Sequence, residues 1–356
     1  MRRLPVEAAA SYAFRGLRLL GGFVFGRPVH CIVQVSNRCN LSCGFCSFWE
    51  RPARREDEMT LADFEVISSK LAEAGSMIIS IEGGEPLMRP DIVGIVRAFA
   101  RHHHPILFTN GWRVTEGLAR ELWDAGLSEI GVSVDFATPG RHDEHRGQKG
   151  TFNAAMRAVE ILRDTAPHGR RQVALMTVLM LDNADELEDL LKISAEKRVN
   201  HQTTLISVGG DGRGDKTDNK RQKLPPPGTG AKMLELKARY PHFIPFSGYI
   251  EGIDPFLEGR APERSTCWAG ERFLNIDHMG EVSPCIEKLH LRAGNLRRDP
   301  WSVVAARLRS FDDQTKGCAD CFTSCKGFVE EMSGPPRRRS YAEFFGNFAS
   351  PPASKT

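Results

Sequence analysis

The segment of this sequence best suited to chemistry holds three cysteines close together, Cys39, Cys43 and Cys46. Three thiolates can each bind one iron of a four-iron, four-sulfur cluster, which leaves the fourth iron open to a further ligand. A zinc site is the alternative. Zinc, however, prefers a fourth ligand nearby, and the nearest histidine, His30, lies inside a predicted strand. The spacing therefore predicts an iron–sulfur cluster with an open coordination position.

A second group of cysteines lies near the C-terminal end. The chain has 9 cysteines, and those of this group are Cys267, Cys285, Cys318, Cys321 and Cys325. An odd number in two groups, within a chain too long to depend on disulfides, indicates metal binding in a reducing compartment. Cys31 is interpreted differently, as a small apolar residue on the inner face of a strand.

The first group, Cys-x3-Cys-x2-Cys with the aromatic Phe45 before its last cysteine, resembles the signature of radical S-adenosylmethionine (radical SAM) enzymes. The resemblance implies that the open iron binds the amine and carboxylate of the cofactor's methionine part. Electron transfer then cleaves the cofactor to a 5′-deoxyadenosyl radical. The same resemblance implies an electron donor such as flavodoxin or ferredoxin. It assigns no catalytic residue beyond those that hold the cluster and the cofactor.

Gly83, Gly84, Glu85 and Pro86 follow the second predicted strand and resemble the GGEP motif of that family. The resemblance implies that backbone carbonyls and the Glu85 carboxylate receive the ammonium group of S-adenosylmethionine. Glycines let the backbone approach a ligand closely, and a carboxylate accepts a charge-assisted hydrogen bond. Taken alone, the motif is also typical of an ordinary strand-to-helix turn. Its position one unit after the cysteine loop favours the cofactor role.

Three further residues complete the expected cofactor site. By the same resemblance, Asn110, Ser133 and Arg146 contact the ribose or the carboxylate of the cofactor. Serine and asparagine at strand ends are as often turn formers, and Arg146 is equally suited to a surface salt bridge. The common edge of the sheet expected for Asn110 and Ser133 favours binding.

The C-terminal cysteines also carry a resemblance. The pattern Cys318-x2-Cys321-x3-Cys325, with Gly280 ahead of Cys285, is similar to a shortened form of the C-terminal extension called SPASM, or to its smaller twitch form. This implies one auxiliary [4Fe-4S] cluster, with first-choice ligands Cys267, Cys285, Cys318 and Cys321. Cys325 replaces one of these or is spare. Zinc is the alternative metal, because four thiolates suit either.

Between residues 29 and 208, apolar strand-like runs alternate with amphipathic helices. The predicted strands cover residues 30–35, 77–81, 106–109, 130–134, 173–180 and 203–207. About six strand–helix units predict an α/β fold, a partial parallel (β/α)6 barrel of the TIM type. A small cysteine-rich iron–sulfur subdomain is expected to follow it. Active sites of parallel α/β folds lie at the carboxyl ends of the strands, where the cysteine loop and the GGEP motif fall.

The composition divides the chain into five segments. Residues 1–28 are expected to form an amphipathic helix, and residues 29–208 the radical SAM core. Residues 209–230, rich in glycine and proline, indicate a linker or mobile loop. Residues 231–335 are expected to form the SPASM- or twitch-like domain, with too few apolar residues for a large core of its own. Residues 336–356, proline-rich and basic, predict a flexible tail.

The N-terminal segment imitates a signal peptide, but Arg18 interrupts its apolar run, which is also too short to span a bilayer. A cytoplasmic location is therefore expected. The helix either packs on the barrel, which is the favoured interpretation, or lies on a membrane surface as a peripheral contact.

The net charge of +3 and the short basic runs give no support to a nucleic-acid partner. We expect a radical SAM enzyme that abstracts hydrogen from its substrate, in peptide maturation or oxidation. Radical modification of a lipid, an isoprenoid or a small alcohol is the alternative. A non-catalytic zinc or iron–sulfur scaffold protein is the remaining interpretation.

Overall fold

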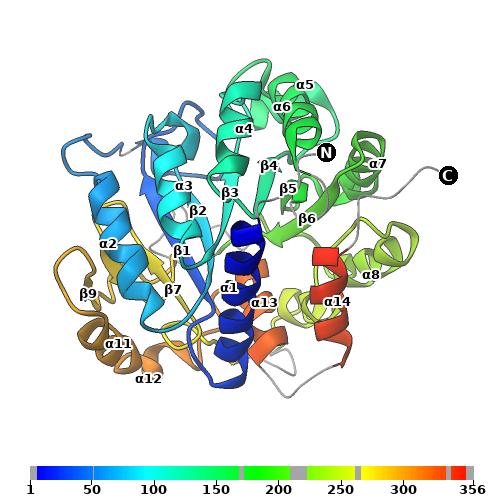
Figure 1. The fold of residues 1–356 in the computed structure, drawn as a ribbon. Helices are drawn as coiled ribbons and strands as arrows, with labels where there is room; N and C mark the ends of the chain where they lie inside the picture. The colour runs from blue at the N-terminus through cyan, green and yellow to red at the C-terminus, as the bar shows by residue number, and fades with distance from the viewer. Residues whose placement is uncertain are drawn as a thin grey trace.

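The computed structural model describes residues 6–50, 52–167, 172–208, 223–260, 266–333 and 338–349. Within them, one sheet has the strand order β6-β5-β4-β3-β2-β1-β7-β8-β9 (Figure 1). The strands are β1 (His30–Ser36), β2 (Ile78–Gly83), β3 (His104–Thr109), β4 (Glu129–Ser133), β5 (Gln172–Leu179), β6 (Asn200–Leu205), β7 (Phe273–Ile276), β8 (Glu281–Ser283) and β9 (Gly294–Asn295). Strands β1 to β7 are paired in parallel, and β8 and β9 are antiparallel. The described strands β6 and β9 form the two edges, so the barrel is partial, as predicted.

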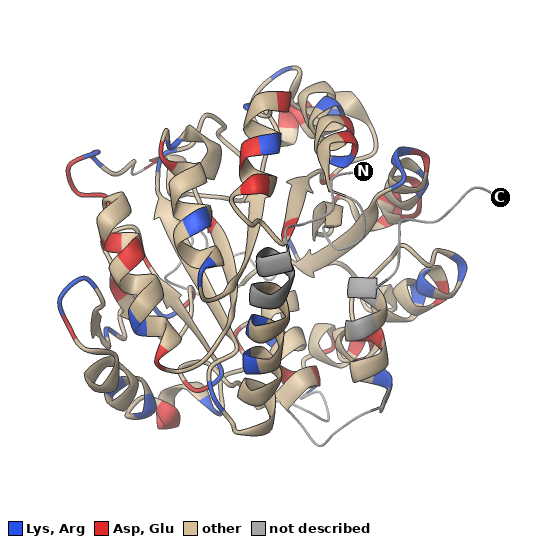
Figure 2. Ribbon diagram, in the orientation of Figure 1, with Lys and Arg blue, Asp and Glu red and all other residues tan. Residues whose placement is uncertain are grey.

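Helices between the parallel strands cover the outer face of the sheet (Figure 1). They are α2 (Leu61–Ala72), α3 (Ile92–Ala100), α4 (Glu116–Asp124), α5 (Pro139–His145), α6 (Thr151–Thr165) and α7 (Leu187–Lys197), with short 3-10 turns η1 (Phe48–Glu50), η2 (Pro86–Met88) and η3 (Ala184–Glu186). On the face shown in Figure 2, acidic and basic residues are interspersed along these helices. Their inner sides pack an apolar core against the sheet, as expected of amphipathic helices.

The C-terminal part of the chain extends the same sheet. Its β7 lies beside β1, with Phe273 opposite His30, and Leu274 and Ile276 are buried in the main core. The helices of this part are α8 (Thr229–Arg239), α9 (Ser247–Glu251), α10 (Ile253–Leu257), α11 (Trp301–Arg309), α12 (Asp312–Thr315), α13 (Ser324–Ser333) and α14 (Arg338–Ala349). The cysteine-rich segment is thus joined to the barrel by strand pairing. Of the predicted linker, residues 209–222 lie outside the described part of the chain.

Helix α14 corrects the expectation of a flexible tail over residues 336–356, because Arg338–Ala349 is helical. Phe344 is buried, and its ring centroid lies 6.0 Å from that of Phe23 and 6.1 Å from that of Phe328. These aromatic contacts hold α14 against the rest of the protein.

Helix α1 (Val6–Val24) packs beside α13 and α14 (Figure 1). Leu19 and Phe23 are buried among the other apolar residues at this end of the barrel. The opposite side of the helix and the turn after it carry exposed apolar side chains, namely Phe14, Leu17, Val24 and Phe25. No helix in the described part of the chain is long and apolar enough to cross a membrane. One face of this helix therefore packs on the barrel, as the favoured interpretation expects, and the other face is exposed.

Candidate active site

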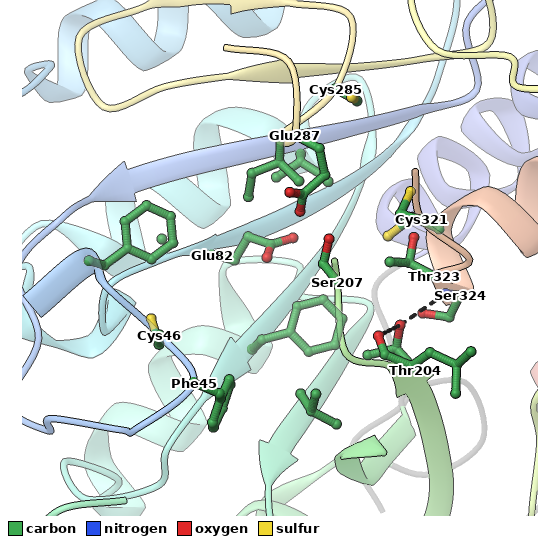
Figure 3. A pocket seen from close by; sticks show the side chains of 18 of the residues that line it. Phe45, Cys46, Glu82, Thr204, Ser207, Cys285, Glu287, Cys321, Thr323 and Ser324 are labelled. Carbon is green, nitrogen blue, oxygen red and sulfur yellow. Dashed lines mark hydrogen bonds between the residues drawn. The ribbon is translucent and has the colours of Figure 1, made fainter. Parts of the chain in front are cut away.

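A cavity of about 220 Å³ lies at the carboxyl ends of the parallel strands, between the N-terminal cysteine loop and the C-terminal cysteines (Figure 3). All eight cysteines predicted as ligands border it. These are Cys39, Cys43, Cys46, Cys267, Cys285, Cys318, Cys321 and Cys325. The predicted cofactor residues Gly83, Gly84, Glu85, Asn110, Ser133 and Arg146 border it as well. Pro86 does not line the cavity, because it is buried as the first residue of the turn η2.

The N-terminal cysteine loop leaves β1 and is held by the segment after α5. The Ser42 amide donates to the Arg146 carbonyl at 3.3 Å, and the Gly44 amide donates to the His145 carbonyl at 3.1 Å. Gly147 has a positive φ of 70°, and a Cβ there would lie 2.8 Å from the Ser42 carbonyl oxygen. Backbone contacts of this closeness fix where the loop presents its thiols.

The two glycines of the GGEP motif are required by the approach of the same loop. A Cβ on Gly84 would lie 2.1 Å from the Arg38 carbonyl oxygen, and one on Gly83 would lie 2.3 Å from that of Ser36. The Gly84 amide donates to the Ser36 carbonyl at 2.7 Å, and the Glu85 amide donates to the Arg38 carbonyl at 2.9 Å. The motif therefore clamps the base of the cysteine loop, in addition to any contact with the cofactor.

Glu85 is buried, and its carboxylate accepts hydrogen bonds from within the protein. Oε1 accepts from the Thr109 hydroxyl at 2.7 Å and from the Leu87 amide at 3.0 Å, while Oε2 accepts from the Asn110 amide at 2.8 Å. Burial raises the pKa of Glu85, and the hydrogen bonds oppose that effect. A carboxylate has about four lone-pair positions, so one remains for an ammonium group.

Arg146 is buried rather than part of a surface salt bridge. Its Nη2 lies 2.5 Å from Oδ2 of Asp135, its Nη1 lies 3.9 Å from the Cys43 sulfur, and its guanidinium lies 5.4 Å from the centroid of the Phe45 ring. In the structure, Arg146 therefore pairs with a protein carboxylate beside the cysteine loop. Its positive charge lies where it would stabilise the cysteine thiolates and also a carboxylate of the cofactor.

Burial dominates the electrostatics of the N-terminal thiols. It raises the pKa of Cys39 to about 12 and also raises the pKa of Cys43, an effect that the Arg146 charge opposes. Iron binds the thiolate form, so cluster assembly has to displace these protons.

Four of the C-terminal thiols form one group. Burial raises the pKa of Cys285 to about 12, and negative charge on Cys267 and Cys318 raises it further. Burial also raises the pKa of Cys321, as does charge on Cys285 and Cys267. Cys325 lies on the first turn of α13, and negative charge on Cys325 and on Cys321 raises the pKa of Tyr249. Which four of the five thiols bind the auxiliary cluster stays a prediction.

The donor set fits iron–sulfur clusters. Within the described residues, no three His, Cys, Asp or Glu side chains gather closely enough to hold a single metal ion. A four-iron cluster makes a different demand, because each thiolate binds its own iron. The N-terminal and the C-terminal cysteines, on two walls of one cavity, each offer several separate thiols for such a cluster.

Two functional candidates could not be identified from the sequence. Glu287 is 7% exposed, and neither of its carboxylate oxygens has a hydrogen-bond partner among the described residues. The Ser207 hydroxyl is buried and equally unpartnered. Both line the cavity, and Figure 3 shows them between Cys46 and Cys321. The only sequence signal was the position of Glu287 two residues after Cys285.

Known proteins resemble the chain over both parts. A family model described as the radical SAM superfamily matches residues 33–193, and one described as an iron-sulfur cluster-binding domain, SPASM, matches residues 267–322. An AdoMet-dependent heme synthase of Methanosarcina barkeri is 26% identical over 317 residues, which cover 81% of this chain and 86% of that protein. The mycofactocin maturase MftC of Mycolicibacterium smegmatis is 27% identical over 317 residues, covering 84% and 77%.

A solved structure is similar in fold. A solved structure of anSMEcpe with bound AdoMet superimposes with a TM-score of 0.60 at 17% identity, covering 90% of this chain and 97% of that one. At such low identity the similarity concerns the fold alone. The two family matches, with the convergence of their cysteines on one cavity, identify the family. The chain belongs to the radical SAM superfamily of enzymes and carries a SPASM iron–sulfur cluster-binding domain.

Proposed function

We propose that this enzyme modifies a peptide substrate by hydrogen abstraction in the cavity between its two cysteine groups. The observation that carries the proposal is that a single cavity is lined by both groups and by Glu85, Asn110 and Arg146. When bound, a reduced [4Fe-4S] cluster supplies the electron that cleaves S-adenosylmethionine to a 5′-deoxyadenosyl radical. An auxiliary [4Fe-4S] cluster, held by the C-terminal cysteines that line the same cavity, would supply a second electron carrier.

The protein's own residues bind and orient the reactants. Cys39, Cys43 and Cys46 would hold the first cluster, and Glu85 would receive the cofactor's ammonium at its remaining lone pair. Asn110, Ser133 and Arg146 border the space left for the rest of the cofactor. The first-choice set Cys267, Cys285, Cys318 and Cys321 would hold the auxiliary cluster.

The substrate-facing wall favours groups that donate hydrogen bonds. The unpartnered carboxylate of Glu287 and hydroxyl of Ser207 face the cavity. The cations that line it in the described part of the chain already have acidic partners. Arg146 pairs with Asp135 at 2.5 Å, Lys288 with Asp320 at 3.1 Å, and Lys326 with Glu330 at 3.7 Å. An uncompensated carboxylate binds a donor and repels an anion.

This argument separates two relatives with different substrates. Peptide amides, hydroxyls and ammonium groups can donate to Glu287, whereas a porphyrin would bring its carboxylates against it. Like charges brought together inside one cavity cost binding energy. The acidic wall therefore supports a maturase-like role over a heme synthase-like role.

A second candidate, modification of a lipid or isoprenoid, is supported by one observation. Phe14, Leu17 and Val24 form an exposed apolar row on α1. Such a row is suited to contact with a membrane surface, from which an apolar substrate would be taken.

The test uses anaerobically reconstituted, dithionite-reduced protein and S-adenosylmethionine. Formation of 5′-deoxyadenosine should be stimulated by hydroxyl- and amine-bearing peptides more than by isoprenoid alcohols or coproporphyrin. The Glu287→Gln variant should raise the KM for the peptide and leave cofactor cleavage without substrate unchanged. Stimulation by coproporphyrin alone, or an unchanged KM in the variant, would contradict the proposal.

A further inference from the structure

The barrel interior is hollow below the active-site cavity. Partly exposed residues recur at every second position along β6 and along parts of β3 and β5, and they stand at both ends of β4. Nearly all of them line one of the two cavities inside the barrel, among them Ile106, Phe108, Glu129, Met176 and Gln202. In a parallel sheet covered on both faces, such residues would be buried, so the pattern marks an empty space. A second cavity, of about 130 Å³, lies here near the amino-terminal ends of the strands. We call it the lower chamber.

The two cavities adjoin each other. Phe108, Met176, Ser324 and Cys325 line both of them. The Phe108 ring lies against Gly131, where an added Cβ would come within 2.8 Å of the ring. The glycine thus provides room for the ring to stand between the cavities.

One carboxyl group in the lower chamber has no partner. Glu129 begins β4, in register between Ile106 of β3 and Gln172 of β5. No hydrogen bond or ion pair joins it to any residue that the structure describes, and no lysine or arginine lines the chamber. Burial raises its pKa to about 7. A carboxyl group enclosed in this way is unfavourable unless a donor or a cation binds to it.

A second unpartnered polar atom lies on the same lining. His30 is 3% exposed, its Nε2 lies 2.8 Å from the Ser80 hydroxyl, and its Nδ1 has no partner among the described residues. Its strand, β1, is separated from β4 by β2 and β3. Two polar groups from well-separated strands therefore border one chamber.

Most of the remaining lining is apolar, and the other residues that border the chamber are Ser80, Gln172, Gln202, Ser324 and Cys325. Phe328 lies at the centre of an aromatic floor, with ring centroids 6.0 Å from Phe246 and 6.1 Å from Phe344. Ile78, Ile106 and Ile244 line the walls. An apolar body with one polar group at its end matches this distribution, as in most small-molecule sites.

We propose that the lower chamber is a binding site for an aliphatic amine, with the chain among the aromatic and isoleucine side chains and the ammonium group on Glu129. An aliphatic alcohol would satisfy Glu129 with one hydrogen bond, but an ammonium also neutralises its charge, and that favours the amine. Above pH 7, where Glu129 is ionised, a carboxylate-ended chain would place two negative charges together and is excluded. This site goes beyond the proposed function, because it requires neither cofactor cleavage nor the upper cavity.

The test measures binding of n-octylamine to the reconstituted enzyme with saturating S-adenosylmethionine, by isothermal titration under anaerobic conditions. The enzyme should bind one n-octylamine per chain. Glu129→Gln should weaken that binding at least about tenfold, as expected for loss of a charge-assisted contact. Ile106→Trp, which fills the chamber, should weaken it as well, and n-octanoate should not compete.

Glu196→Gln is the matched control, because it removes an exposed carboxylate of α7 that lines neither cavity. Its affinity for n-octylamine should equal that of the unmodified enzyme. Iron content and thermal melts establish that each variant is folded. Absence of binding, equal affinity in Glu129→Gln, or an equal loss in Glu196→Gln would overturn the proposal.

Discussion

Arg146 and Asp135 form an ion pair inside the protein, with 2.5 Å between Nη2 and Oδ2. Arg146 is 7% exposed and Asp135 is fully buried. The second amino group of the same guanidinium lies 3.9 Å from the Cys43 sulfur. A carboxylate that follows β4 thereby holds a positive charge against the cysteine loop that follows β1.

Replacing Asp135 with Asn should destabilise the protein strongly. Asn keeps the oxygen that accepts from the Val178 amide at 3.0 Å, but it leaves the Arg146 charge buried without its partner. Breaking a buried pair from one side costs about 3–5 kcal/mol. The melting temperature of the reconstituted protein should fall by about 10 °C.

The control for this variant is Asp164→Asn. Asp164 also pairs with an arginine, Arg163, at 2.7 Å, but its side chain is 64% exposed. Exposed ion pairs contribute little to stability, so the melting temperature of Asp164→Asn should match that of the unmodified protein. Equal melts for the two variants would show that the Asp135 pair is not structural.

Gly84→Ala should remove the N-terminal cluster and leave the C-terminal one. The new Cβ would lie 2.1 Å from the Arg38 carbonyl, a backbone atom that cannot move without shifting Cys39. Iron content should fall by about half, and deoxyadenosine formation should cease. Gly117→Ala, at an exposed site in α4 with open space around it, should retain full iron. Full iron content in both variants would show that Gly84 is not needed to hold the cysteine loop in place.

The sequence was sufficient to predict the parallel strands and both cysteine groups. Apolar runs alternate with amphipathic helices over a long stretch, and the spacing of Cys39, Cys43 and Cys46 is local. Because the carboxyl ends of parallel strands meet at one edge, residues such as Asn110 and Ser133 could be placed together from their positions at the ends of predicted strands.

Other features depend on contacts between distant parts of the chain. The pairing of β7 with β1 joins residues more than 200 positions apart, which no local pattern specifies. The partners of Glu85 and Arg146 lie on neighbouring strands or loops, so their structural roles appear only in the fold. Glu287 has no hydrogen-bond partner among the described residues. A sequence cannot show that a buried carboxylate has no partner.

Glu129 should make stability depend on pH. Its pKa in the folded protein is raised from 4.5 to about 7, so the folded state holds a proton that the unfolded state has released. Stability therefore falls as the pH rises from about 4.5 to about 7, by roughly 3 kcal/mol in all. Glu129→Gln should melt several degrees above the unmodified protein at pH 8, with a smaller difference at pH 5.5.

The control is Glu196→Gln, since Glu196 is exposed on α7. Its melting profile should follow that of the unmodified protein at both values of pH. A constant difference between Glu129→Gln and the unmodified protein across this range would show that Glu129 does not titrate as described.

The exposed row of α1 should bind anionic vesicles if the second candidate function holds. Phe14→Glu with Leu17→Glu places two charges on the row and should abolish flotation with phosphatidylglycerol vesicles, with an unchanged melt. Phe23→Glu, at a buried position of the same helix, should instead lower the melt. If the unmodified protein does not float, the lipid substrate loses its support.

The most direct test of two clusters facing one cavity is the iron content of the variant in which Cys39, Cys43 and Cys46 are all replaced by Ala. The unmodified protein, reconstituted without oxygen, should hold about eight irons per chain, from two four-iron clusters. Cys31→Ala, at a buried cysteine that does not line the cavity, should hold the same number. The triple variant should retain about half of the iron and form no deoxyadenosine. Complete loss of iron, or zinc in place of iron at the C-terminal cysteines, would contradict the account.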